Sequence, residues 1–125
     1  MTHDEFVKNY YEIAKHALAF NKKAIKEGLL ALEDQLDSEK INDRDIFEYG
    51  MQFVIDGHDQ EIINPILSNI INQEKDEYMR ILKNIQKEAV FSMQAGENPK
   101  ILYQKMNSLT DINFKDDEMR KLLDE

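Results

Sequence analysis

The 125-residue chain contains no cysteine, so disulfide bonds and thiolate metal sites are excluded and a reducing compartment is allowed. It also lacks any apolar run near the roughly 18 to 20 residues that cross a bilayer. Its start, MTHDEFVKNYYEIAK, is too charged for a secretory signal. Since this length buries one modest core, we expect a single cytoplasmic domain without membrane insertion.

Basic residues are too few to balance the acidic ones. The chain has 16 Lys and Arg against 25 Asp and Glu, which gives a net charge of -9. Nucleic acid and anionic lipid surfaces would be repelled by this charge, so we predict no nucleic-acid partner. A basic or mixed-charge protein surface is the kind of partner that the composition allows.

The first 36 residues predict one long helix. Thr2 and Glu5 have the spacing of a capping box, in which each side chain satisfies a backbone N–H of the other residue. Apolar residues then recur every three or four positions as far as Leu36. Gly28 lies inside this run, where it either permits close approach of another backbone or marks a bend. The polar segment DSEKINDRD, residues 37–45, is expected to be a loop.

A second helix is expected over about residues 45–56, where Gly57 would end it. Asp59 is suited to cap a third helix. Pro65 would then lie a turn and a half inside this helix, where its ring clashes with the carbonyl four residues earlier. Two alternatives follow: Asn64 caps a new helix that starts at Pro65, or the helix is kinked there.

The apolar pattern is helical from residue 65 to residue 95, apart from NQEKDE at 72–77, which has no apolar member. A helix of about 30 residues is roughly 45 Å long, too long for a compact chain of this size to cover. No repeat and no strand-like alternation is present. The predicted fold class is therefore all-α, a helical bundle with one long helix over about 65–95 that is completed by dimerisation.

The stretch from Ala89 to Leu109 predicts a sharp corner between two helices. Gly96 can take the left-handed conformation that closes a helix, and Asn98 can cap the next helix through its side-chain oxygen. Pro99 suits a first helical position because its missing N–H needs no partner there. A short helix is expected after this corner, followed by a polar tail over residues 110–125.

Residues that could carry chemistry are sparse. His16 lies one turn after Glu12, and such helix-surface pairs are usually solvated. The sequence has no phosphate loop, nucleophile elbow or dinucleotide fingerprint, so we predict no enzyme activity and no cofactor. A metal or catalytic site is a third-ranked hypothesis, because four potential ligands without calcium-loop or zinc-motif spacing surround Gly57: Asp56, His58, Asp59 and Glu61.

Three segments occur in a telling order: KEGLLALED at 26–34, FEYGMQFVIDGHDQEIINPIL at 47–67 and FSMQAGENPKILYQKMNSL at 91–109. The first two together resemble the cytoplasmic region that follows the second membrane helix in the flagellar motor stator protein MotA family. The third resembles the cytoplasmic tail after that family's fourth membrane helix. The resemblance covers roughly residues 24–109.

The family's four membrane helices have no counterpart in this sequence. An amphipathic helix over residues 1–24 stands in place of the first pair, and the second pair is missing at about residues 72–79. The family's proton-channel residues lie in those helices, so the resemblance implies neither ion conduction nor torque generation. We expect one helical domain over 1–125, with the extra helix at 1–24, a stator-like region at 24–109 and the tail at 110–125.

In the family, two residues near the glycine of the segment that KEGLLALED resembles contact the rotor's switch protein. One is a basic residue three positions before that glycine, and the other is an acidic residue five positions after it. The resemblance places Ile25 at the basic position and Glu33 at the acidic one. Lys26 is one residue, or about 100° of helix rotation, from the basic position. The candidate partner-binding residues are Lys26, Glu33 and Asp34. In the alternative reading, LLALE is simply the buried and exposed sides of a helix.

In the family, the helix that leads up to the second membrane pair and the helix that follows it are antiparallel neighbours. In this sequence NQEKDE fuses the two end to end, which would leave an apolar stripe without a partner in the same chain. We therefore predict a homodimer in which the stripe meets a second copy. The resemblance implies a soluble, stator-like scaffold or regulator, with the rotor switch complex or stator subunits as partners. The second hypothesis is a generic helical interaction module with a partner outside the motor.

Overall fold

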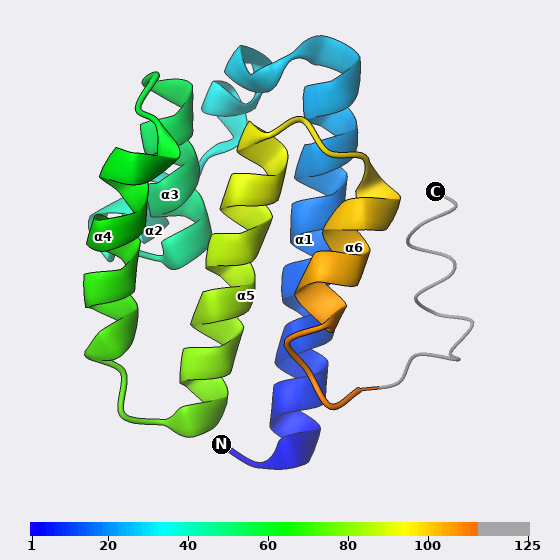
Figure 1. The fold of residues 1–125 in the computed structure, drawn as a ribbon, viewed down its shortest axis with the longest axis vertical. Coiled ribbons are helices and arrows are strands. Elements are labelled where there is room, and N and C mark those ends of the chain that lie inside the picture. Colours follow the sequence, from blue (N-terminus) through cyan, green and yellow to red (C-terminus); the bar gives the residue numbers. More distant parts are fainter. Residues whose placement is uncertain (113–125) are drawn as a thin grey trace.

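The computed structural model describes residues 1–112, and within them the chain is helical with no strand, which confirms the all-α prediction. The helices stand side by side, with α5 near the middle of the view (Figure 1). In chain order the elements are α1 (His3–Glu27), the 3-10 helix η1 (Leu29–Gln35), α2 (Ser38–Asn42), α3 (Ile46–Ile55), α4 (Gln60–Asn72), α5 (Glu77–Gln94) and α6 (Pro99–Asn107).

Helix α1 begins as its capping box predicts but ends earlier than its apolar pattern suggests. The Thr2 hydroxyl oxygen accepts from the Glu5 backbone N–H at 3.2 Å and donates to the Glu5 carboxylate at 3.1 Å. The helix ends before Gly28, which has φ of 92° and nothing within 4 Å of where a Cβ would be. Gly28 therefore marks a bend rather than a close approach, and LLALEDQ continues as η1.

The segment predicted to be a loop contains the short helix α2. The Asp37 carboxylate accepts from the backbone N–H groups of Glu39 and Lys40, which is what starts this turn of helix. Helix α4 begins at its predicted cap, since Asp59 accepts from Ile62 N–H, and α3 begins after a cap that was not predicted, Asp45, which accepts from Glu48 N–H. Helix α4 runs through Pro65 from Gln60, so the alternative in which a helix starts at Pro65 is wrong.

The single helix predicted over residues 65–95 is wrong. Helix α4 ends at Asn72, the chain turns over residues 73–76, and α5 begins beside α4 in the opposite direction (Figure 1). Asp76 caps α5 by accepting from Met79 N–H at 2.9 Å. The Arg80 guanidinium donates to the Glu74 carbonyl, and Lys83 lies 2.9 Å from the Glu74 carboxylate. Glu74 and Asp76 of the segment without apolar residues thus form the hydrogen bonds that hold this turn.

This reversal buries the apolar stripe within one chain. Apolar residues of the α4–α5 hairpin that are at most 2% exposed include Ile63, Leu67, Ile71, Leu82, Ile85 and Ala89. The homodimer was predicted because this stripe was expected to lack a partner in the same chain, and the hairpin supplies that partner. The oligomeric state itself stays a prediction.

The corner between α5 and α6 has the predicted chemistry. Gly96 has φ of 73°, the Asn98 side chain accepts from Ile101 N–H at 3.0 Å, and Pro99 is the first residue of α6. The corner is also tied to α1, because the Asn21 side-chain amide donates to the Glu97 carbonyl at 2.9 Å. Of the tail predicted over 110–125, Ile112 packs against the core, and residues 113–125 lie outside the described part of the chain.

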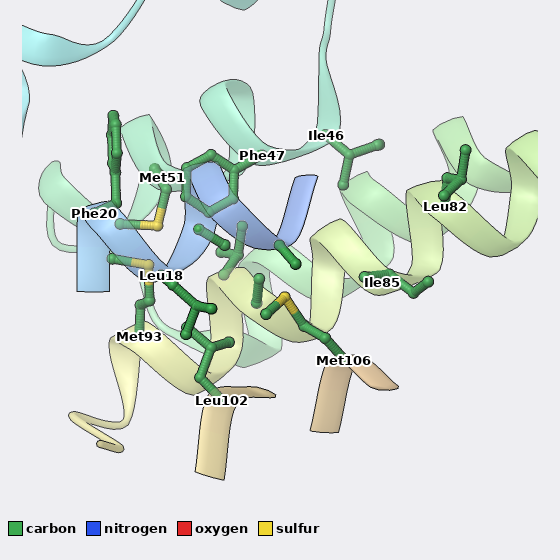
Figure 2. Close-up of a cluster of buried hydrophobic side chains, with 14 of the residues drawn as sticks. Leu18, Phe20, Ile46, Phe47, Met51, Leu82, Ile85, Met93, Leu102 and Met106 are labelled. Carbon is green, nitrogen blue, oxygen red and sulfur yellow. The ribbon is translucent and has the colours of Figure 1, made fainter. Parts of the chain in front are cut away.

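Helix α5 packs against α1, α3, α4 and α6, so the core lies around it. Figure 2 shows Leu18, Phe47, Ile85 and Met106 among the side chains that converge there from four helices. At Gly50 the α3 backbone comes so near α5 that a Cβ would lie 2.9 Å from a methyl group of Val90. None of the helices within residues 1–112 is both long enough and apolar enough to cross a membrane.

The hairpin can be tested with a pair of introduced cysteines, because the chain has none of its own. The Lys87 ammonium donates to the Ser68 hydroxyl at 3.2 Å, so a short thiol-specific cross-linker should join Ser68→Cys to Lys87→Cys within one chain. In a straight helix these positions would be roughly 28 Å apart and could react only between chains. Mass spectrometry should find the cross-link in a monomer-sized product.

The single variant Ser68→Cys is the control, because any cross-link in it must join two chains. If the double variant gave only dimer-sized products, the hairpin would be contradicted.

Candidate functional site

The three predicted partner-binding residues lie at one end of the bundle, at the top of Figure 1. Lys26 is in the last turn of α1, and Glu33 and Asp34 are in η1. All three side chains are exposed, and none forms an ion pair within residues 1–112. The structure therefore leaves all three accessible on two consecutive segments at one end of the bundle.

The backbone under these residues differs from the continuous α-helix that was expected. Lys26 and Glu33 belong to two different helices separated by the bend at Gly28, so a rotation of 100° per residue does not relate them. In a 3-10 helix, residues three apart share a face. Leu29 and Leu32 accordingly face inward, with Leu32 completely buried, while Leu30 and Glu33 share another face.

A side-chain hydrogen bond that sequence reasoning missed joins α1 to α3, between a partly exposed histidine and a buried carboxylate. His16 of α1 and Glu48 of α3 meet with Nε2 and Oε1 2.7 Å apart, and Glu48 is only 1% exposed. The other Glu48 oxygen accepts from Asp37 N–H at 3.3 Å. The His16 ring also contacts the rings of Phe20 and Phe47, with centroids 4.5 and 5.1 Å apart.

The pair was missed because its members are 32 residues apart in the sequence, whereas the sequence offered His16 a nearby partner, Glu12. The signal that could have revealed the pair was the carboxylate of Glu48, which lies among core positions of α3. Glu48 ties α1, α3 and the start of α2 together, so it fixes the far end of the η1 segment. A cleft of about 600 Å³ next to it has a mixed lining that includes Ile13, Arg44 and Lys83.

The segment around Gly57 has local structural tasks. Asp56 accepts from the Gln52 side-chain amide at 2.9 Å, Asp59 caps α4, and the His58 carbonyl accepts from Gln94. Within residues 1–112, no group of three or more His, Asp or Glu side chains is placed to hold a metal ion. The geometry of this segment therefore gives the third-ranked hypothesis no support.

At the corner, Lys105 binds Glu97 with Nζ and Oε1 2.7 Å apart. This hydrogen bond is the main reason why the pKa of the Glu97 carboxyl lies below its ordinary value of 4.5. The ion pair joins the turn after α5 to the second turn of α6. Glu97 and Lys105 thus have a structural role at the corner and are paired with each other, unlike Lys26, Glu33 and Asp34.

Motility protein A of Borreliella burgdorferi is 40% identical to this chain over 76 residues. The chain is similar to Motility protein A. The match covers 58% of this chain but only 28% of that protein, so the chain spans less than a third of its relative's length. No protein-family model and no solved structure matches the chain. The similarity supports a relationship to Motility protein A at the level of the family.

We expect His16→Ala to lower the free energy of unfolding by about 1–3 kcal/mol. The variant removes the side-chain hydrogen-bond partner of a buried carboxylate and leaves Glu48 with the Asp37 backbone donor. Urea denaturation followed by circular dichroism measures the loss.

His3→Ala is the matched control, since His3 also lies beside a carboxylate and contacts two aromatic rings, but its partner Asp111 is exposed where Glu48 is buried. It should cost less than about 1 kcal/mol. Equal losses in the two variants would show that the burial of Glu48 has no special energetic weight.

Proposed function

We propose that the chain is a non-enzymatic, stator-like scaffold or regulator that acts through protein contacts in the bacterial flagellar motor. The observation that carries this proposal is the 40% identity with Motility protein A over 76 residues. The proposal is limited to a contact role, because the resemblance covers only segments outside the membrane helices of that family. We propose the rotor switch complex as the first partner to test and authentic stator subunits as the second.

The end of the bundle that carries Lys26, Glu33 and Asp34 is the contact surface in this proposal. Support comes from their exposure and from the absence of ion pairs to them within residues 1–112. Charged side chains without intramolecular partners can pair with a partner's charges at little cost in lost interactions. Their backbone is held in place by buried Leu32, so little ordering is needed on binding.

A second candidate function is a helical interaction module with a partner outside the motor. The match allows this candidate, since it spans only 28% of Motility protein A. Self-association into a homodimer fits either candidate. Sedimentation of the full chain at tens of micromolar would decide between a monomer and a dimer.

Reversing the acidic charges of the contact surface should weaken binding to the rotor switch protein of the same bacterium. We expect the double variant Glu33→Lys/Asp34→Lys to bind at least about tenfold more weakly, because two attractive contacts become repulsive. Binding by the wild-type chain should also weaken as salt is raised. Isothermal titration calorimetry or surface plasmon resonance measures both effects.

The control is Glu12→Lys/Glu61→Lys, which makes the same change in net charge at exposed positions of α1 and α4. Its affinity should stay within about twofold of the wild type. Equal losses in both double variants would mean that only the net charge matters and that the surface is misassigned. If the wild-type chain bound neither the switch protein nor stator subunits, the motor role would be rejected.

A further inference from the structure

The two most exposed large apolar side chains within residues 1–112 lie at the same end of the bundle. Leu30 is 72% exposed and Ile25 is 55% exposed, whereas the other exposed members of this class reach at most 52%: Met1, Ile62, Ile101 and Leu109. Leu30 is five positions after Ile25, so their Cα atoms lie within about 18 Å of each other. Two exposed apolar side chains therefore lie on the same segment as Lys26, Glu33 and Asp34.

Leu30 is exposed on a fixed backbone. Gly28 N–H donates to the Ala24 carbonyl at 2.8 Å, Ala31 N–H donates to the Gly28 carbonyl at 3.3 Å, and Leu36 N–H closes the other end of η1. Leu32, two residues after Leu30, is completely buried. The segment cannot turn Leu30 inward without taking Leu32 out of the core, so the fold itself keeps Leu30 in water.

The segment that carries these two apolar side chains is acidic. Residues 25–39 contain five carboxylates and a single base, Lys26. Glu33 shares the face of η1 on which Leu30 stands, because 3-10 residues three apart are eclipsed. A side chain of this kind complements an apolar pocket with positive charge at its edge, since the pocket removes the leucine from water while the charges pair at the rim.

We propose that Leu30 is the anchor of this contact, inserting into an apolar pocket on a protein partner whose rim carries Lys or Arg side chains that meet Glu33 and Asp34. Ile25 packs at the edge of the same pocket. The inference rests on the proposed function in placing the contact at this end, and it adds the residue that supplies the binding energy and the chemistry of the partner's surface.

The first test measures binding of the full chain to the rotor switch protein and to stator subunits. Leu30→Ser should bind about 10- to 100-fold more weakly, because the burial of one leucine side chain is lost. Leu30→Met should stay near the wild type, since it keeps the apolar contact. Ile62→Ser is the matched control, an exposed apolar residue of α4 that is 52% exposed, and should change affinity less than twofold.

Leu30→Ser binding as tightly as the wild type would overturn the anchor while leaving the motor role intact. If the wild-type chain binds neither motor component, the motor role fails and a second measurement decides the anchor. A photo-reactive amino acid is then placed at position 30, and at position 62 as the control, in cells that express the full chain.

The proposal requires a covalent adduct at position 30 that is absent at position 62, with its attachment point on the identified partner among apolar residues flanked by Lys or Arg. No adduct at position 30, the same adduct at both positions, or an attachment point flanked by acidic residues would each overturn it.

Discussion

Helix α5 is the element on which the rest of the structure depends, because it is buried against four other helices. Its residues Leu82, Ile85, Ala89 and Val90 are each at most 1% exposed. The α3 backbone can approach α5 closely only because position 50 has no side chain to collide with Val90. Burial of this helix is possible within one chain only when α4 turns back at residues 73–76, so the turn and the core stabilise each other.

The contact end of the bundle illustrates how a core residue can control a surface. Leu32 is buried, and this fixes η1 in an orientation that places Leu30, Glu33 and Asp34 in solvent. The bend at Gly28, with φ of 92°, separates this segment from α1 and takes it over the end of the bundle. The packing of its neighbours holds the apolar Leu30 side chain in water, which is unfavourable for the free chain. Burial of that side chain against a partner would therefore favour binding.

Glu48 shows a second route by which the interior supports that end. Its carboxylate is almost completely buried and is satisfied by His16 and by the backbone of Asp37. A buried polar group is tolerated only when it is hydrogen bonded, so these two contacts fix α1, α3 and the start of α2 relative to one another. The η1 segment is thereby anchored at both of its ends, at Gly28 and at Asp37.

The sequence by itself determined the helix ends at Thr2, Asp59, Gly96 and Asn98, since a cap or a glycine stop joins groups within a few residues of each other. It also carried the similarity to Motility protein A. Only the tertiary structure decided the reversal at 73–76, the pairing of His16 with Glu48 and the exposure of Leu30. These depend on which distant surfaces bury one another, and the local spacing of apolar residues in a continuous helix is the same as in a hairpin of two helices.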